Sequence, residues 1–464
     1  MSTLNSTPRL LHRALVRAGY RMAYGGSRVA RRHAELEASQ WWPKEQHRAA
    51  QWAKLLRLVG HAYRNVPYYR HVMQAQGIEP RSIRGPEDFA KLPLLSKQEV
   101  NTHREELVAT NVPKEHLFKT ASGGSTGMPV TLYHDAEMIA GYRAAKLRNF
   151  HWAGWEPGGA WARLWGSQFD VAPHKALKQR LWDHLTRVLV LPCWDMTETT
   201  MQAYASNLRS FQPDVIEAYV TPMYLFARFM KEQGITDIQP KGIICSAEML
   251  FPYQRELIQD AFHCKVFNRY GGREMGDVAH ECPSGTMHMN TENVYVEFVR
   301  DGRPAQPGEP GELVLTALDL YGMPLLRYRV EDVGTPSEKV CACGRGLPAM
   351  EVVEGRVQDL ITLPSGRFLP GEFFPHLFKD FDVVQFQVEQ DRLDHLTVRI
   401  VRGPALSDQH LDYLLAKIRD YTKGTVKLDV EFCQRIATTA SGKFRYTISH
   451  VPPQLAQAKE AAHA

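Results

Sequence analysis

The sequence predicts an α/β protein with a large N-terminal domain and a small, mobile α+β domain at its C-terminal end. In the middle of the chain, apolar β-type runs at residues 215–219 and 242–245 alternate with helical patterns at 224–233 and 253–261. Such alternation is typical of α/β layers. Towards the C-terminus the strand-like and helical runs form a second, shorter set. These two patterns predict the two domains.

The elements follow in order along the chain. Helical periodicity dominates up to about Glu106, and the helical stretch 52–63 is followed by Asn65-Val66-Pro67, where proline ends the helix. From residue 118 to 133, a run rich in Gly, Ser and Thr leads into a β-type segment, which predicts a loop between two strands.

A β-rich part follows the α/β layers. Residues 294–316 alternate as antiparallel strands do, with glycine and proline at the turns. Beyond it, strand-like runs at 383–388, 396–401 and 427–432 and a helical run at 408–421 form the small domain. The expected organisation is a basic amphipathic segment over 1–40, a large domain over 41–354, a hinge over 355–360, the small domain over 361–452 and a flexible tail over 453–464.

The composition is that of an ordinary globular protein. Of the 464 residues, 44% are hydrophobic, and the net charge of +5 is too small for this length to indicate nucleic acid as a partner. Seven cysteines, an odd and mostly scattered set, do not form a disulfide framework. With no apolar stretch long enough for a membrane span or a secretory signal, we expect a cytoplasmic protein.

The N-terminal segment is basic. Arg9, Arg13, Arg17 and Arg21 recur every fourth residue, so they share one face of a helix, and no acidic residue precedes Glu35. A solvated helix face is the simplest interpretation. Peripheral contact with an anionic membrane surface is the alternative, and a transit peptide is a third.

A Gly/Ser-rich turn is the first candidate site. Three glycines and three hydroxyl residues let backbone N–H groups converge on phosphate oxygens without obstruction by side chains. No lysine follows the last glycine, so this is not a Walker loop, and an ordinary turn is the alternative. The candidate phosphate-binding residues are Ser122, Gly123, Gly124, Ser125, Thr126 and Gly127.

A second candidate site is a structural zinc centre. Cys282 and His288, together with Cys341 and Cys343 in a Cys-Ala-Cys-Gly turn, provide three thiolates and one imidazole. This is a complete tetrahedral shell for Zn²⁺ with no open position. Cysteines scattered through the core are the alternative, and His280 is a reserve ligand.

The turn at 122–129 resembles the phosphate-binding signature of the adenylate-forming superfamily, which includes acyl-CoA synthetases, luciferases and peptide-synthetase adenylation domains. Residues 61–70 and 92–97 are similar to the phenylacetate–CoA ligase branch, and more narrowly to its CapK-like members. The resemblance spans residues 52 to 449. It implies that the two expected domains are a large AMP-binding domain and a small domain that rotates on the hinge.

The resemblance assigns a nucleotide site. Residues 268–274 resemble the Tyr-Gly-x-x-Glu motif, in which the aromatic ring lies on adenine and the carboxylate holds Mg²⁺. Tyr270 and Glu274 inherit these roles. The resemblance also implies contacts around the nucleotide and the acyl group: the turn residues Gly271 and Gly272, the adenine-pocket residues Ala247 and Glu248, and Tyr219 and Thr221 beside the acyl site.

Three later motifs complete the implied site. Asp332 stands where the family binds the ribose hydroxyls, a task that suits a carboxylate because it accepts two hydrogen bonds. Arg356, in the hinge signature 355–359, would contact the nucleotide. Lys443, in Ser441-Gly442-Lys443, would bridge the substrate carboxylate and the α-phosphate and offset their repulsion in the transition state. We expect Lys443, Glu274 and Arg356 to be catalytic.

The implied function is ATP- and Mg²⁺-dependent activation of a carboxylic acid, aryl or arylacetic in this branch, as acyl-AMP, followed by transfer to coenzyme A. Residues 360–370 replace the family's Gly-rich, Asn-containing segment with a short hairpin-like turn. Direct amide or ester formation with an amine or hydroxyl is therefore an alternative. A non-catalytic, membrane-docked binding protein is another. The acid, the acceptor and the oligomeric state, including a homodimer, stay open.

Overall fold

The computed structural model of the chain describes residues 27–121, 130–165, 186–193, 196–356, 361–365, 368–369, 373–378, 381–437 and 445–451. The arginines at 9–21, the Gly/Ser turn at 122–129, the hinge residues 357–360, Lys443 and the tail lie outside these ranges. Among the described residues, no helix is both long enough and apolar enough to span a bilayer.

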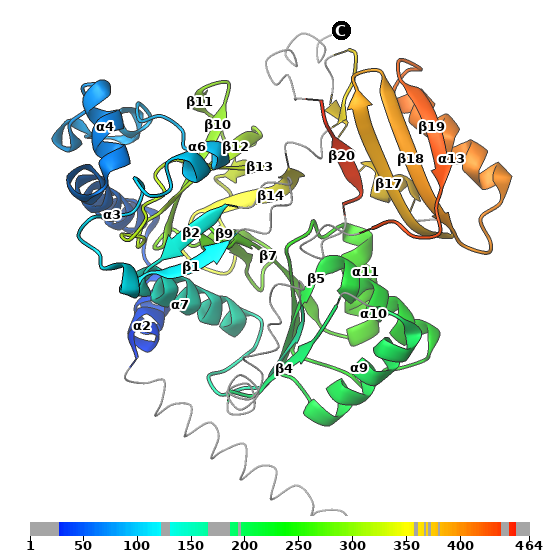
Figure 1. Ribbon diagram of the computed structural model, residues 1–464. Helices are drawn as coiled ribbons and strands as arrows, with labels where there is room; N and C mark the ends of the chain where they lie inside the picture. The colour runs from blue at the N-terminus through cyan, green and yellow to red at the C-terminus, as the bar shows by residue number, and fades with distance from the viewer. Residues whose placement is uncertain are drawn as a thin grey trace, which may run out of the picture.

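A twelve-stranded mixed sheet runs through the large domain (Figure 1). One half consists of parallel strands with helices between them, as the alternating pattern predicted. These elements are β3 (Trp161–Leu164), β4 (Val188–Leu191), α9 (Glu198–Phe211), β5 (Val215–Tyr219), α10 (Val220–Glu232), β6 (Gly242–Ser246), α11 (Pro252–Phe262) and β7 (Lys265–Gly272). Apolar side chains of α9, α10 and α11 pack on the strands and form one core, which includes Phe226, Ile243 and Phe262.

The other half of the sheet is antiparallel, which confirms the β-rich part. It follows the order β11-β10-β12-β13-β14-β9-β8 and joins the parallel half at β7. Its strands are β8 (Gly276–Glu281), β9 (Met287–Met289), β10 (Val294–Arg300), β11 (Arg303–Pro304), β12 (Gly311–Ala317), β13 (Tyr328–Ser337) and β14 (Ala349–Arg356).

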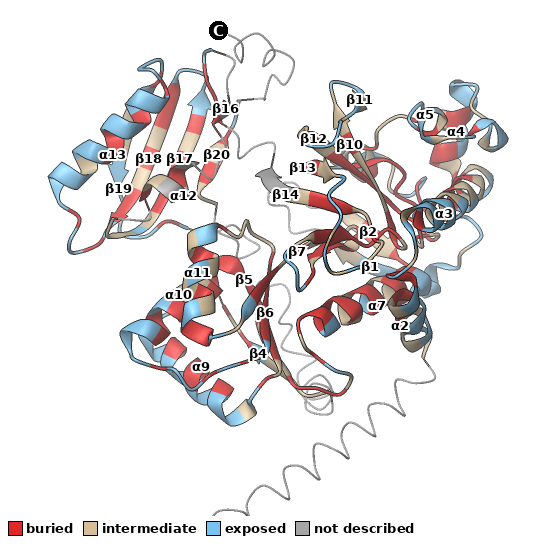
Figure 2. Ribbon diagram, turned by 180° about the vertical axis from the view of Figure 1, so that it is seen from behind, coloured by how far each residue is buried: buried red, intermediate tan, exposed pale blue. Residues whose placement is uncertain are grey.

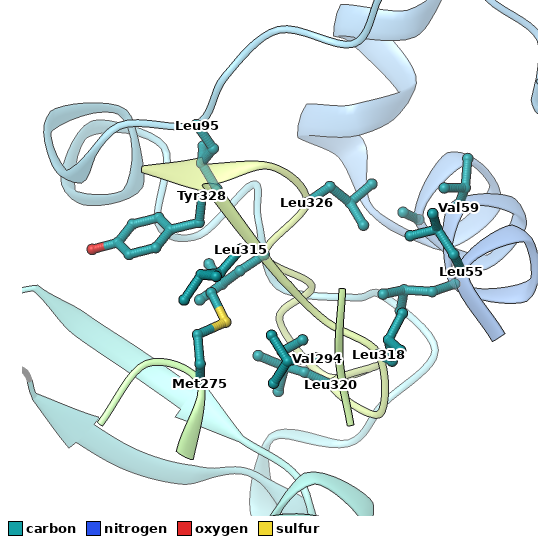
Figure 3. Packing of buried hydrophobic residues seen from close by; sticks show 14 of the residues in the cluster. Leu55, Val59, Leu95, Met275, Val294, Leu315, Leu318, Leu320, Leu326 and Tyr328 are labelled. Carbon is teal, nitrogen blue, oxygen red and sulfur yellow. The ribbon is translucent and has the colours of Figure 1, made fainter. Parts of the chain in front are cut away.

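The N-terminal helices cover this antiparallel half. The predicted helix at 52–63 is confirmed within α3, which ends at Asn65 before Pro67. The elements before the middle of the sheet are α2 (Arg28–Ser39), α3 (Lys44–Asn65), α4 (Pro67–Ala75), η1 (Pro80–Ser82), α5 (Pro86–Phe89), α6 (Lys97–Thr102), η2 (Lys114–His116), β1 (Phe118–Ala121), β2 (Thr131–His134) and α7 (Ala136–Trp152). Figure 3 shows Leu55 and Val59 of α3 near Leu318, and Leu95 beside Tyr328, in one shared core.

The described part of the basic N-terminal segment packs on the large domain. Helix α2 buries Leu36 against α7. Arg28 pairs with Glu137 at 3.0 Å, and Arg32 pairs with Asp319. These two arginines therefore stabilise intramolecular contacts, whereas the regularly spaced arginines before them lie outside the described residues.

The small domain is an α+β unit, as predicted. Its four-stranded sheet has the order β19-β18-β17-β20. Helix α13 lies beside this sheet and exposes its outer face, as Figure 2 shows. The elements are β15 (Ile361–Thr362), β16 (Phe368–Leu369), α12 (Phe373–Phe378), β17 (Val383–Arg392), β18 (His395–Arg402), α13 (Asp408–Tyr421), β19 (Lys427–Phe432) and β20 (Thr447–Ser449). In Figure 1 its strand β20 lies on the side of α11.

Candidate functional site

The centre of the site is a contact between two predicted residues. The hydroxyl of Tyr270, near the end of β7, donates a hydrogen bond of 2.7 Å to Oδ2 of Asp332 on β13. In the sheet, Asp332 is the direct backbone partner of Arg356 on β14. The structure therefore brings the predicted adenine, ribose and hinge positions to one place. The side chain of Arg356 is not among the described ones.

In the turn between β7 and β8, two backbone segments approach each other closely. A Cβ on Gly271 would clash with the carbonyl oxygen of Gly276, so only glycine fits there. A Cβ on Gly272 would lie 2.8 Å from Oε2 of Glu274, which shows that the Glu274 carboxylate folds back over this glycine. Both predicted glycines thus hold the shape of the turn that carries Glu274.

This turn is attached to the start of the predicted phosphate loop. Nη1 of Arg273 donates a hydrogen bond of 3.2 Å to the carbonyl oxygen of Ala121, the last described residue before Ser122. Strands β1 and β2, which flank the loop, form an antiparallel pair. The predicted candidates 122–127 themselves are outside the described residues, but Arg273, the neighbour of the metal-side candidate Glu274, contacts the point where the loop begins.

Tyr328 is a residue of this site that the sequence prediction missed. It is fully buried, and among the described atoms its hydroxyl has no hydrogen-bond partner. Burial, and then the carboxylates of Glu274, Glu331 and Asp332, raise the pKa of Tyr328 above its usual range. A neutral hydroxyl donor next to three carboxylates fits a site for a hydroxylated, metal-bound ligand. The signal was its place in the Arg327-Tyr328-Arg329 motif.

The chain around Tyr328 is held in an uncommon conformation. Arg327 and Glu331 both have positive φ, at 52° and 65°. Such backbone is costly for side chains other than glycine and often accompanies functional sites. Nζ of Lys97 lies 2.5 Å from Oε2 of Glu331, and backbone bonds join Leu95 to both Arg327 and Arg329. The segment 95–97 therefore fixes the backbone beside Asp332.

The predicted acyl-side residues gather at the ends of β5 and β6. Oε2 of Glu248 accepts a hydrogen bond of 2.6 Å from the backbone N–H of Thr221, the second residue of α10. A carboxylate at a helix N-terminus is stabilised by the free N–H groups and the helix dipole. Ala247, with φ of 73°, makes the bend that directs Glu248 there. Glu248 therefore has a capping role that the sequence did not predict.

An aromatic pair lies beside Thr221. The ring of Tyr219 is 4.2 Å from the ring of Trp165, at an interplanar angle of 49°. Arg163 and Arg269 lie over the Trp165 ring, with centroid distances of 5.0 and 5.6 Å. The end of β5 thus carries an aromatic surface backed by cations.

Below this surface is a buried ion cluster that the sequence prediction also missed. Glu217, fully buried in β5, pairs with Lys146 at 2.9 Å, Arg163 at 2.8 Å and Arg269 at 2.6 Å. Burial alone would raise the pKa of Glu217, but the three cations lower it well below its usual range. Burial lowers the pKa of Lys146 to about 8 against the pull of Glu217. A charged residue inside the apolar run Val-Ile-Glu-Ala-Tyr was the signal.

The four predicted zinc ligands meet on one side of the sheet. Their ligand atoms all lie within 4.8 Å of one another, with Sγ of Cys282 and Cys341 3.6 Å apart and Nε2 of His288 3.3 Å from Sγ of Cys343. Ligands placed about 2.0–2.3 Å from one tetrahedral ion are roughly 3.3–3.8 Å apart, so the spacing fits Zn²⁺. The described cluster does not include His280.

The protonation pattern also suits a metal. Nδ1 of His288 lies 2.9 Å from the carbonyl oxygen of Leu347. A carbonyl only accepts, so Nδ1 carries the proton and Nε2 offers its lone pair to the cluster. Burial opposes ionisation of Cys341, but hydrogen bonds from Thr286, Cys343 and Cys282 lower the pKa of its thiol. These residues can therefore hold a structural zinc ion.

The small domain matches the family model of the CapK C-terminal domain over residues 361–450. Over 342 residues the chain is 27% identical to phenylacetate–coenzyme A ligase of Thermus thermophilus, covering 71% of this chain and 74% of the relative. It is 23% identical to the protein CapK of Staphylococcus aureus, covering 84% and 86%. The chain is therefore similar to phenylacetate–CoA ligases and to CapK, and its small domain matches the CapK C-terminal domain. This confirms the resemblance seen in the sequence.

Solved structures share the fold of this chain. 2-Hydroxyisobutyryl-CoA ligase in the postadenylation state superposes with a TM-score of 0.69 at 18% identity, covering 89% of this chain and 91% of the other. The same ligase in the thioesterification state gives a TM-score of 0.58 with the same coverage. The amide bond synthetase McbA of Marinactinospora thermotolerans gives 0.52 at 16% identity, covering 72% and 70%. The expected adenylate-forming fold with a large and a small domain is confirmed.

Proposed function

We propose that this protein is an ATP-dependent ligase that activates a carboxylic acid as acyl-AMP and then transfers the acyl group to coenzyme A. The observation that carries this proposal is the hydrogen bond from Tyr270 to Asp332, with Arg356 as the direct strand partner of Asp332. The side chain of Arg273, three residues after Tyr270, also contacts Ala121, where the Gly/Ser turn begins. The phenylacetate–CoA ligase relatives support the same reaction.

In the first half-reaction, a carboxylate oxygen of the acid attacks the α-phosphorus of ATP and pyrophosphate leaves. We assign the neutralisation of the two anions to Lys443, the ribose hydroxyls to Asp332, the phosphates to residues 122–127 and a nucleotide contact to Arg356. Glu274 would hold Mg²⁺, which prefers a single carboxylate combined with phosphate and water oxygens. In the second half-reaction, a thiolate attacks the acyl carbon and AMP leaves with its bridging oxygen.

A second acceptor class is an amine or hydroxyl. Residues 361–362 and 368–369 pair as the short hairpin β15–β16, where the family usually has a Gly-rich segment. A structural neighbour with a TM-score of 0.52 is an amide bond synthetase. These two observations keep direct amide or ester formation as the alternative second half-reaction.

For the acid we propose an aryl or arylacetic compound. The aromatic pair Tyr219 and Trp165 stands next to Thr221, at the position assigned to the acyl group. Planar rings stack favourably on such surfaces. Several relatives are named phenylacetate–coenzyme A ligases, which supports the same class.

We further propose that Cys282, His288, Cys341 and Cys343 hold a structural Zn²⁺ ion. A closed shell of four protein ligands would join β9 to the turn after β13 and supply no open position for chemistry. Reduced thiols are required for this role, which supports a cytoplasmic location. Peripheral membrane contact through the N-terminal segment 1–40, a homodimer and a non-catalytic binding role are further proposals. The combination of Glu274, Asp332 and Lys443 favours an enzyme over the last of these.

Pyrophosphate release from ATP over a panel of acids tests the proposed function. We expect release that depends on an aryl or arylacetic acid and that falls strongly in Lys443→Ala and Asp332→Ala. Mass analysis of products made with coenzyme A and, separately, with hydroxylamine identifies the acceptor. Wild-type release that no acid stimulates would contradict the proposal.

A further inference from the structure

Tyr446 joins the two domains. Its backbone belongs firmly to the small domain, because the N–H of Val388 on β17 donates a hydrogen bond of 2.8 Å to the carbonyl oxygen of Tyr446. Nε2 of Gln387 likewise donates to the carbonyl oxygen of Arg445 at 3.0 Å. The main chain at this position therefore moves with the small-domain sheet.

The side chain of Tyr446 contacts the large domain. Nε2 of Gln254, on α11, lies 3.4 Å from the Tyr446 hydroxyl oxygen. The Tyr446 ring is 6.0 Å from the ring of Phe251 in an edge-to-face arrangement, and 5.1 Å from Phe386 of its own domain. The ring thus bridges an aromatic residue of each domain, and aromatic contacts at these distances are favourable.

The large-domain partner is itself fixed. Gln254 is fully buried, and its Oε1 accepts a hydrogen bond of 3.1 Å from the backbone N–H of Phe251 at the start of α11. Since the amide oxygen is held in this way, its Nε2 is directed towards Tyr446. The phenol therefore meets a donor whose orientation is set by the helix terminus.

The contact reaches the acyl side of the candidate site. Burial raises the pKa of Tyr446 above its usual range, and the neighbouring Thr221 side chain opposes this only in part. Thr221 is also the residue whose N–H is bound by Glu248. The neutral phenol of a small-domain residue thus lies beside the position assigned to the acyl group.

The sequence links this contact to the catalytic lysine. Lys443 precedes Tyr446 by three residues, and three residues of chain extend at most about 10–11 Å. A fixed Tyr446 therefore limits how far Lys443 can stand from Thr221. The overall superposition agrees, because the same ligase fits better in its postadenylation state than in its thioesterification state, with TM-scores of 0.69 and 0.58.

We propose that Tyr446 is a positioning residue for acid activation: its side chain, held by Gln254 and Phe251, locks the small domain in the arrangement that presents Lys443. This inference rests on the proposed function and deepens it. The second half-reaction, which needs a rotated small domain, does not use the Tyr446 contact. Loss of the contact should therefore affect the two half-reactions unequally.

The test measures the half-reactions separately in the full-length protein. Acid-dependent ATP–pyrophosphate exchange reports activation, and transfer from supplied acyl-AMP to the acceptor reports the second step. For Tyr446→Ala we expect exchange to fall about 30-fold or more and transfer to change less than about 3-fold, with Tyr446→Phe between Tyr446→Ala and wild type. The matched control is Tyr413→Ala, an exposed tyrosine on α13 of the same domain. It should leave both steps unchanged.

Hydrogen exchange provides a readout that does not depend on turnover. Tyr446→Ala should speed amide exchange in residues 251–255, where α11 begins, whereas Tyr413→Ala should not. The positioning role would be overturned if Tyr446→Ala slowed both half-reactions equally, or if it left ATP–pyrophosphate exchange unchanged. Wild-type protein without ATP–pyrophosphate exchange would contradict the proposed function instead, and unaltered amide exchange in Tyr446→Ala would then still refute the contact.

Discussion

The Tyr270 hydroxyl lies 2.7 Å from the Asp332 carboxylate, although 62 positions separate the two residues in the sequence. Each was assigned to nucleotide binding from its own motif. The contact reaches across the sheet, because β8, β9 and β14 stand between β7 and β13 in the strand order, and Arg356 lies opposite Asp332. The tyrosine both orients the carboxylate and occupies one of its acceptor positions.

Removing the Asp332 carboxylate should weaken ATP binding. We expect Asp332→Ala to raise the dissociation constant about 10- to 100-fold, because charge-assisted hydrogen bonds to both ribose hydroxyls are lost. Tyr270→Phe, which removes only the orienting bond, should have a smaller effect. Titration calorimetry measures both, with the exposed Asp412→Ala on α13 as the matched control. Unchanged affinity in Asp332→Ala would refute the ribose assignment.

Disrupting the cysteine–histidine cluster should remove a metal and destabilise the large domain. Purified protein should contain about one Zn²⁺ per chain, and Cys282→Ser should lose it and lower the melting temperature by several degrees, since metal binding contributes to folding free energy. Metal analysis and calorimetry provide the measurements. Cys433→Ser, in the small domain, should retain the zinc. A wild-type protein without stoichiometric zinc would end this assignment.

Glu217 should be required for stability. Glu217→Gln leaves the buried Arg269 and the partly buried Lys146 and Arg163 without this counter-ion, and breaking a buried ion pair typically costs about 3–5 kcal/mol. The matched control is Glu309→Gln, whose partner Arg303 is largely exposed, and for which we expect a small effect. Thermal denaturation and soluble yield are compared for the two variants. Equal stability of Glu217→Gln and Glu309→Gln would contradict the importance of the cluster.

The small domain should lose stability as the pH rises through neutrality. His395 lies between two carboxylates, with Nδ1 2.6 Å from Asp391 and Nε2 2.8 Å from Asp429, and these bonds raise the pKa of His395. Because the pKa of His395 is raised in the folded state, its stabilising effect is complete below the pKa of histidine in the unfolded chain, about 6.5. The effect is lost as the pH rises through the higher pKa of His395 in the folded protein.

Calorimetry of His395→Gln at several pH values measures this effect. The melting temperature of the variant should lie below that of the wild type at pH 5.5, and the gap should narrow by pH 8.5. His116→Gln, at an exposed position of the large domain, should show no such trend. A difference in melting temperature that widens as the pH rises would contradict the expected stabilisation by protonated His395.

Local patterns predicted the elements well but not the interactions between them. The apolar runs at β5 and β6 and the helix ending before Pro67 were visible because burial and proline geometry act on neighbouring residues. The four candidate zinc ligands were recognisable in the sequence because thiolate and imidazole residues in close sequence spacing rarely serve ordinary packing. Their convergence in space agrees with that expectation.

Other features depend on residues distant in sequence. The three partners of Glu217 come from α7, β3 and β7, and no periodicity in β5 indicates them. The capping of α10 by Glu248 depends on the neighbouring strand β6, and Tyr446 meets Gln254 only when two domains are placed together. Tertiary context alone determines such contacts, so single-sequence reasoning could not find them.

The central claim is that a carboxylate oxygen attacks the α-phosphorus of ATP. The most direct measurement uses an acid whose carboxylate carries ¹⁸O, with ATP and an acceptor, followed by mass analysis of the phosphorus products. Because the bridging oxygen stays with AMP when the acyl group is transferred, we predict one ¹⁸O atom in AMP. Label in inorganic phosphate with ADP as the other product, or unlabelled AMP, would contradict the acyl-adenylate account.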